Sequence, residues 1–320
     1  MTRSSYSLFR VREAGTIGGL LALCVFLWIA TPHFMTASNL MNVVEQSAIL
    51  GILAVGMTFV ILAGGIDLSV GSLVALAGVV FGTAVQAGAS PGIAILVALA
   101  TGAACGIASG ALITIGRLPA FIATLGMMSV ARGLALMLSD GRPISGFDAG
   151  FRALSTGRFA GIPVPTLLML CTYGVAAFVL SRSVFGRYVY AVGGNEEAAA
   201  LAGVNVRVVK IAVYAISGVL SAVSSLLLIA RLNSAQPVAG ISFELDAIAA
   251  VVIGGASLLG GSGTVMGTLV GALIMAVLRN GLNLLDVSSY VQQVAIGVVI
   301  VAAVLVDMTL HRRGPHSGVR

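Results

Sequence analysis

Residues Ser181 to Lys210 have the sequence SRSVFGRYVYAVGGNEEAAALAGVNVRVVK. This is the longest interior interval of the chain that a membrane span cannot accommodate. Four of the seventeen basic residues lie in it, with two glutamates between them, and apolar segments flank it on both sides. The interval is therefore expected to lie in water at a membrane surface, and it separates the apolar chain into two parts.

A short helix is predicted within this interval. Asn195 is a suitable N-cap, because its side-chain oxygen can accept a free amide hydrogen of the first turn. Glu196 and Glu197 follow where the helix dipole favours negative charge. Alanines continue the helix to Ala202, and Gly203 can end it in a left-handed conformation. A helix of about two turns is unstable alone in water, so it must rest against this chain's own spans or against a partner.

The composition is that of an all-α integral membrane protein with one transmembrane domain, residues 1–320. The chain is 58% hydrophobic and 9% charged, whereas soluble domains have roughly 25% charged residues. The net charge of +6 does not indicate nucleic-acid binding, because the basic residues gather near the ends of spans. Cys24, Cys105 and Cys171 lie in apolar segments without C-x-x-C spacing, so we expect core residues and no metal site or disulfide.

The hydropathy pattern predicts about ten membrane helices, because a span needs about 20 apolar residues. The first span is expected to remain uncleaved, since no small-x-small site follows it. The predicted spans are 15–31, 42–63, 67–87, 92–115, 118–138, 164–181, 208–231, 244–260, 264–285 and 289–307.

The distribution of basic residues predicts that both termini are cytoplasmic. This orientation places eleven of the seventeen basic residues on the inner side, as the positive-inside rule requires. It makes 182–210 a cytoplasmic loop and 139–163 an outer loop rich in turn-forming residues. The eleven are Arg3, Arg10, Arg12, Arg117, Arg182, Arg187, Arg207, Lys210, Arg312, Arg313 and Arg320.

Glycine patterns suggest an internal duplication and close helix packing. GGIDLSVGSLV (Gly64 to Val74) aligns with GGSGTVMGTLV (Gly260 to Val270), and internally duplicated bundles are common among transporters. Glycines four residues apart form a groove along one helix face that lets another backbone approach. Two such sets are predicted to pack helices: Gly102, Gly106 and Gly110, and Gly263, Gly267 and Gly271.

Several polar residues fall in or beside the apolar segments, where they mark either a substrate pathway or a structural feature. Asp67 and Ser69 follow the break at Gly64 and Gly65, so Asp67 either lines a pathway or caps the next helix. The same choice, between a functional contact and a structural role, applies to the remaining candidates. Glu244 and Asp246 contact a substrate or remain hydrated at the interface, Arg132 finds a partner or snorkels outward, and Asn280 and Asn283 face a pathway or bond across helices.

The chain has no motif for catalysis or for ATP hydrolysis. A P-loop needs a lysine after its second glycine to bind the terminal phosphates. The only lysine, Lys210, lies between Val209 and Ile211. Neither H-E-x-x-H nor G-x-S-x-G occurs, so we expect neither an enzyme nor a metal site.

Four ordered motifs resemble the ribose-type permease subunits of ABC importers. They are GMTFVILAGGIDLSVGS (Gly56 to Ser72), LPAFIATLGMM (Leu118 to Met128), GRYVYAVGGNEEAAALAGVNV (Gly186 to Val206) and AVVIGGASLLGGSGTVMGT (Ala250 to Thr268). Together they extend over nearly the whole chain.

The resemblance implies a multi-span permease of the bacterial inner membrane that carries a monosaccharide or similar small polyol. Its implied partners are a second permease copy or paralogue, a cytoplasmic ABC ATPase that binds Mg-ATP, and a periplasmic substrate-binding protein; this chain itself would hold no cofactor. It also implies that the loop from Gly193 to Gly203 is the coupling element received by the ATPase. The residues of that coupling helix and its flanks are Gly193, Gly194, Asn195, Glu196, Glu197, Ala198, Ala199, Leu201 and Gly203.

Three alternatives stay open at this point. The related branched-chain amino acid permeases share the general architecture, although the residues of the motif GGIDLSVGS favour the sugar permeases. An ion-coupled secondary transporter would use Asp67 and need no ATPase. A membrane scaffold without transport activity is the third.

Overall fold

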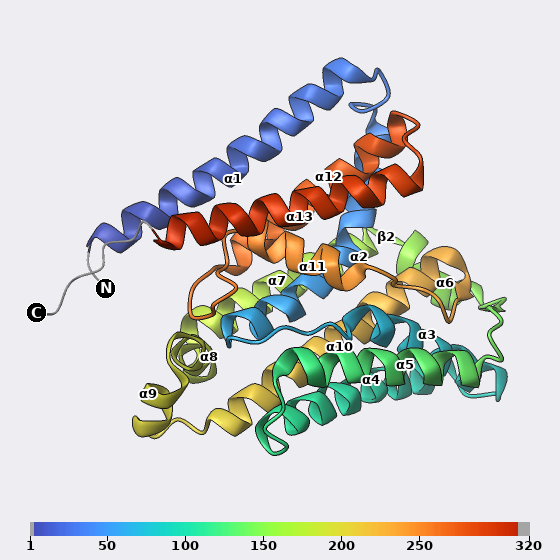
Figure 1. The fold of residues 1–320 in the computed structure, drawn as a ribbon. Helices are drawn as coiled ribbons and strands as arrows, with labels where there is room; N and C mark the ends of the chain where they lie inside the picture. Colours follow the sequence, from blue (N-terminus) through green and yellow to red (C-terminus); the bar gives the residue numbers. More distant parts are fainter. Residues whose placement is uncertain (1–2, 313–320) are drawn as a thin grey trace, which may run out of the picture.

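A computed structural model describes residues 3–312, although not the side chains at 3–14, 303 and 306–312. Arg313 and Arg320, which enter the orientation argument, lie outside the described residues. The described chain is almost entirely helical (Figure 1). Its helices are α1 (Arg3–Ala30), α2 (Ala37–Leu62), α3 (Val70–Gln86), α4 (Pro91–Thr114), α5 (Ala120–Leu138), α6 (Ala149–Thr156), α7 (Val164–Arg182), α8 (Val184–Gly194), α9 (Glu196–Leu201), α10 (Val206–Leu232), α11 (Phe243–Ile253), α12 (Val265–Leu284) and α13 (Ser289–Arg312).

Each of the ten predicted spans overlaps one helix of the described chain. Six of these helices are long and apolar enough to cross a membrane: α2, α4, α5, α7, α10 and α12. Two others are too short by the same standard: α3 has 17 residues and α11 has 11. At 1.5 Å per residue, α11 extends about 16 Å, roughly half of a hydrocarbon core of about 30 Å.

The molecule has two distinct ends. The start of α1, the last turns of α13 and the helices α8 and α9 lie at one end, which we call the α9 end (Figure 1). The helix α6 lies at the opposite end, the α6 end, with two small antiparallel pairs. These pair β1 (Ile144–Ser145) with β4 (Ser234–Ala235), and β2 (Arg158–Phe159) with β3 (Ile162–Pro163).

Glycines bring α4 and α10 into backbone contact. A Cβ atom added at Gly102 would clash with the carbonyl oxygen of Gly218, and one added at Gly106 would clash with that of Tyr214. At Gly110 the added atom would lie 2.7 Å from the Cα atom of Ile211. The first predicted glycine set therefore does pack one helix against another.

The second glycine set is only partly a helix face. A Cβ atom added at Gly267 or Gly271 would clash with backbone oxygens of Gly254 and Ala250, so these two glycines pack α12 against α11. Gly263 lies before α12 in the preceding linker, at a φ of 145°. Its inclusion in the set was wrong, because Thr264 is the N-cap and the helix begins only at Val265.

Both short helices follow a non-helical linker that enters the bundle. Linker 63–69 precedes α3, and linker 236–242 precedes α11. The hydroxyl of Ser225, late in α10, bonds the carbonyl of Val74 in α3, so α3 begins beside the interior of α10. The end of the second linker contacts the first turn of α3, since a Cβ atom added at Gly71 would clash with the carbonyl oxygen of Gly240.

The contacts between helices repeat in the two halves of the chain. Helix α4 packs along α10, and α12 packs along α2. Helix α3 contacts α4 and α5, just as α11 contacts α12 and α13. In this pattern α11 is the counterpart of α3, whereas the alignment of Gly64–Val74 with Gly260–Val270 pairs α3 with α12. The repeated contacts therefore favour a different pairing of the two halves from the one that the glycine motifs suggest.

The predicted outer loop 139–163 contains a helix that the sequence analysis missed. Asp148 caps α6 by accepting a hydrogen bond from the backbone of Phe151. The ring of Phe151 stacks on Phe81 of α3 with centroids 4.2 Å apart, and Phe147 packs beside both. The loop is thus folded onto the end of α3, because these three aromatic rings bury one another.

Candidate functional site

Helix α9 has the caps that the sequence predicts. The side chain of Asn195 accepts a hydrogen bond from the backbone of Ala198 at 2.8 Å, and Gly203 follows the helix with a φ of 86°. Ala199 is buried in the largest apolar cluster, so the helix rests on its own chain. Leu201, in contrast, is 90% exposed. One face of α9 is therefore anchored, and an apolar side chain projects from its last turn.

The two glutamates of α9 differ in their surroundings. Glu196 forms an ion pair with Lys210 in the first turns of α10, which ties the two helices together. Glu197 is exposed at the surface. Gly194 is the last residue of α8 and Ala198 lies within α9, so Asn195 alone separates the two helices.

Helix α8 leads into α9 and was not predicted. It is amphipathic: Val189 and Val192 are buried, while Arg187 is exposed. The phenol of Tyr190 donates a hydrogen bond of 2.9 Å to the carbonyl of Gly263, in the linker before α12. Burial raises the pKa of Tyr190 above its usual value, so this donor stays protonated at neutral pH.

The linkers before α3 and α12 meet the end of α8 in what we call the glycine junction: Gly64, Gly193, Gly194, Gly260 and Gly261. A Cβ atom added at Gly193 would clash with the carbonyl oxygen of Leu62, the last residue of α2. That same oxygen accepts a hydrogen bond of 3.0 Å from the backbone of Gly261. An atom added at Gly260 would lie 2.8 Å from the Cα atom of Gly64. Backbone thus touches backbone, without intervening side chains.

Asp67 lies in the linker before α3 and is completely buried. One carboxylate oxygen accepts hydrogen bonds from the backbone and the hydroxyl of Ser69, at 3.0 and 2.6 Å. The other accepts a bond of 2.8 Å from the hydroxyl of Ser217 in α10. These three donors satisfy the carboxylate, and no basic group among the described residues pairs with it. Asp67 shapes the turn before α3 but does not cap the helix, whose N-cap is Ser69.

Gly64 and Gly65 are placed where the linker leaves α2. Gly64 has a φ of 75°, which favours glycine. The backbone carbonyl of the next residue, Ile66, accepts hydrogen bonds of 3.3 Å from the hydroxyls of Tyr214 and Thr124. Side chains of α10 and α5 therefore replace the helical hydrogen bonds that the linker lacks.

Arg132 stabilises the second linker. Its guanidinium donates hydrogen bonds of 2.7 and 2.8 Å to the carbonyls of Pro237 and Ala239. The side chain therefore has partners within the bundle. The sequence offered no sign of these partners, since they lie more than 100 residues away.

Asp246 and Arg279 form an ion pair between α11 and α12. Asp246 is only 2% exposed, so it is not the hydrated interfacial residue that was one of the two expectations. Glu244 lies two residues earlier, and its carboxylate and the Arg132 guanidinium attract each other. The sequence analysis did not single out Arg279, whose positive charge compensates for the burial of the Asp246 carboxylate.

Asn280 and Asn283 bond across helices and lie apart from Asp67. Asn280 exchanges two side-chain hydrogen bonds with Asn39, in the first turn of α2, at 2.7 and 3.0 Å. The side-chain oxygen of Asn283 accepts a bond from Gln292 of α13 at 2.8 Å. The structure therefore divides the predicted polar residues between several places and does not assemble them into one site. Among the described residues, no three potential metal ligands come together.

Comparison with known proteins gives consistent matches over most of the chain. The family model described as "Branched-chain amino acid transport system / permease component" matches residues 39–304. The chain is 48% identical to the ribose import permease protein RbsC of Haemophilus influenzae, over 90% of each chain. It is 47% identical to RbsC of Bacillus subtilis, over 93% of each, and to RbsC of Escherichia coli K12, over 92% of this chain and 93% of that one. The chain belongs to the ribose-type ABC permease family. No solved structure matches it.

Membership of this permease family accounts for the multi-pass membrane character and for the missing P-loop. The chain is a transport subunit and not an ATPase. The matched region contains both linkers, the glycine junction, α8 and α9. The features that organise this permease thus lie in the part shared with its relatives.

Proposed function

We propose that this permease is the membrane subunit of an ATP-driven importer for a monosaccharide or similar small polyol. It would work in the bacterial inner membrane, with a second permease copy or paralogue. A cytoplasmic ABC ATPase would bind and hydrolyse Mg-ATP, and a periplasmic binding protein would deliver the sugar. The relatives named as ribose import permeases support the substrate class.

The observation that carries this proposal is the construction of α9. Leu201 projects from a helix whose other face is anchored by Ala199. The backbone just before α9 is in contact with the linkers before α3 and α12. A push on α9 by a partner would therefore reach both linkers without passing through a flexible side chain. That is the arrangement expected of a coupling helix.

The orientation belongs to the same proposal. We place the α9 end in the cytoplasm, together with both termini. We also propose that the chain crosses the membrane ten times. Five spans in each half would give the halves opposite orientations, since an odd number of crossings reverses the direction of the chain. The repeated helix contacts support an inverted repeat of α2–α5 and α10–α13. This replaces the duplication suggested by the two glycine motifs.

The first test is reconstitution of the complete transporter. The permease, its ATPase and its binding protein would be placed in proteoliposomes and given a panel of labelled pentoses, hexoses and polyols, with leucine beside them. We expect sugar uptake that requires hydrolysable ATP. ATP-dependent uptake of leucine alone would favour the branched-chain amino acid alternative, a substrate class that the description of the matching family also names.

A second arm of the test concerns ion coupling through Asp67. The three hydrogen bonds to its carboxylate favour a fixed structural charge over one that exchanges ions. Uptake that continues without ATP while an ion gradient remains would contradict the proposal. Replacing Glu196 and Glu197 together by lysine is expected to lower co-purification of the ATPase while membrane insertion is unchanged. Unchanged co-purification and uptake would remove the coupling role from α9.

A further inference from the structure

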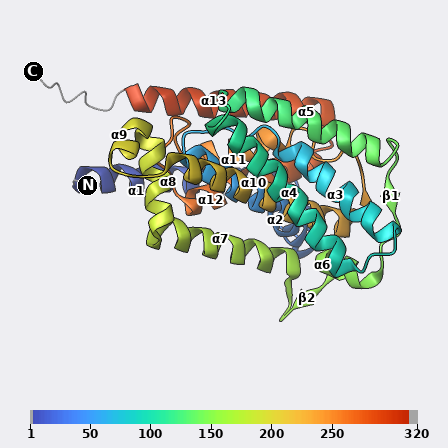
Figure 2. The same ribbon diagram turned by 90° about the horizontal axis from the view of Figure 1, so that it is seen from below.

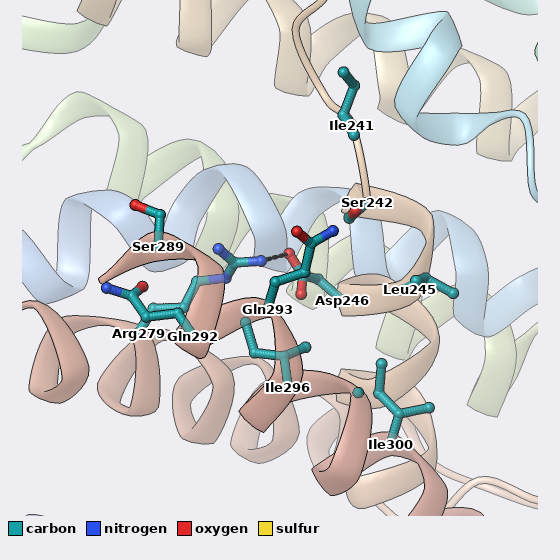
Figure 3. A pocket seen from close by; sticks show the side chains of 11 residues that line it. Ile241, Ser242, Leu245, Asp246, Arg279, Ser289, Gln292, Gln293, Ile296 and Ile300 are labelled. Carbon is teal, nitrogen blue, oxygen red and sulfur yellow. Dashed lines mark hydrogen bonds and ion pairs between the residues drawn. The ribbon is translucent and has the colours of Figure 1, made fainter. Parts of the chain in front are cut away.

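A pocket of about 280 Å³ opens between α11, α12 and α13, on the α6-end half of the bundle (Figures 1 and 3). Its volume is close to the lower limit of small-molecule sites, about 300 Å³. The linker before α11 forms one wall, with Ile241 and Ser242, and α13 forms the opposite wall. On the orientation proposed above, a substrate arriving from outside would meet this pocket before it met the glycine junction. We call it the outer pocket.

The outer pocket contains a buried carboxylate oxygen without a donor. One oxygen of Asp246 is paired with Arg279, but its Oδ1 atom has no hydrogen-bond partner among the described residues. Burial of such an atom is unfavourable and rare in folded proteins. A hydroxyl group of a bound molecule would supply the missing donor. This atom is the observation that indicates a ligand.

The other polar groups of the outer pocket supply donors and acceptors in a small space. Figure 3 shows Gln293 extending from α13 beside the Asp246–Arg279 pair, with Ser242 on the opposite wall. Ser289 lies along the same face of α13, whereas the amide nitrogen of Gln292 already donates to Asn283 and to the carbonyl of Val287. Amides and hydroxyls both donate and accept, as do the hydroxyl groups of a polyol. Leu245, Ile296 and Ile300 provide an apolar surface for its C–H groups.

The charges of the outer pocket favour a neutral ligand. Asp246 and Arg279 are already paired, so the pocket has no excess charge to attract an ion. A zwitterionic amino acid would bind through its two charges only by separating this pair, and breaking a partly buried ion pair is unfavourable. Ser242 has a φ of 68° without the hydrogen bonds of a capping side chain. Such backbone strain in a residue other than glycine is frequent at ligand sites.

We propose that Asp246, Arg279, Gln293 and Ser242 form a subsite of the permease that binds a neutral polyhydroxylated substrate during transport. This proposal rests on the proposed sugar-import function and adds the residues of recognition. Asp246 accepts a hydrogen bond from one hydroxyl through Oδ1, and Gln293 bonds a second. Substrate selection is then shared between the binding protein and this subsite of the permease.

The test uses the reconstituted transporter and the same panel of sugars. The variants are Gln293→Leu and Asp246→Asn, and the control is Gln86→Leu, at an exposed glutamine on the end of α3. Loss of one net hydrogen bond should lower the rate of uptake of the transported sugar about three- to tenfold. The number of sugar molecules moved per ATP hydrolysed should fall by the same factor, whereas Gln86→Leu should leave both the uptake and this ratio at the wild-type values.

The outcomes separate this proposal from the proposed function. Uptake and coupling in Gln293→Leu equal to those of the Gln86→Leu control would overturn the subsite while sugar import remained established. If the Asp246→Asn variant fails to assemble with the ATPase, the uptake of Gln293→Leu alone decides whether the subsite exists. Wild-type transporter that carries leucine and no sugar would overturn the proposed function, and the subsite with it.

Discussion

The glycine junction and the outer pocket are built in opposite ways. The junction brings together five glycines from two linkers and the end of α8, and their closest contacts are between backbone atoms. The outer pocket is lined mainly by side chains, charged, amide and apolar, from three helices and the linker before α11. Backbone contacts between linkers transmit displacement because nothing between them can rotate, whereas side chains can adjust to a ligand. On the two proposals, transmission would belong to the α9 end and recognition to the α6 end.

The largest effect is expected when a methyl group is forced into the glycine junction. In Gly193→Ala the new Cβ atom would clash with the carbonyl oxygen of Leu62. Overpacking costs about 1–3 kcal/mol, and more where backbone must move. We expect uptake to fall at least about tenfold, since 1.4 kcal/mol already corresponds to that factor.

The neighbouring glycine is a matched control for that experiment. A Cβ atom added at Gly194 would have nothing within 4 Å. Uptake in Gly194→Ala should therefore be close to that of the wild type. Equal loss in both variants would mean that helix propensity, and not contact between linkers, explains the glycines.

Next in size is the loss of the arginine that supports the second linker. Arg132→Leu leaves the carbonyls of Pro237 and Ala239 without their donor. Hydrogen bonds to a charged group contribute about 1.5–3 kcal/mol, so thermal unfolding in detergent should occur several degrees earlier. Sugar uptake should fall as well, because Ser242 at the end of this linker lines the outer pocket. Arg142→Leu, at an exposed position in the outer loop, is the control and should change neither quantity.

A smaller effect is expected at Asp67, where side chains and not glycines hold the linker. Ser217→Ala removes one of three donors to a buried carboxylate. The expected loss of stability is about 1.5–3 kcal/mol. Ser221→Ala removes a hydroxyl that bonds only the backbone of its own helix, so its effect should be smaller. Measured unfolding that ranks the two serines in the reverse order would contradict the role given to Asp67.

The sequence predicted the structural features that depend on residues close together along the chain. Each segment that apolar length predicted contains a helix, although α3 and α11 are short, and Asn195 and Gly203 marked both ends of α9. It did not reveal α8 or α6, because helices of 11 and 8 residues carry too few apolar positions to form a clear period. The sequence also gave no indication that α3 and α11 start inside the bundle. That depends on hydrogen bonds from other helices.

The outer pocket and the glycine junction could not be predicted from the sequence, and the reasons differ. Asp246 and Arg279 lie 33 residues apart on separate helices, and neither forms a motif with its neighbours. Gly64, Gly193 and Gly260 were noticed in three separate motifs, but nothing local indicated that the motifs touch. The resemblance to a permease family identified α9 as important without explaining what it pushes against. The structure supplies that contact.

The most direct test of the central claim, that the ATPase acts on α9, is its affinity for the permease when Leu201 is changed. Leu201 is 90% exposed on α9, and Phe159 is 73% exposed at the opposite end. Leu201→Asp should reduce co-purification of the ATPase and ATP-driven uptake together, with unfolding unchanged, while Phe159→Asp should leave ATPase binding intact. Wild-type binding and uptake in Leu201→Asp would contradict the account.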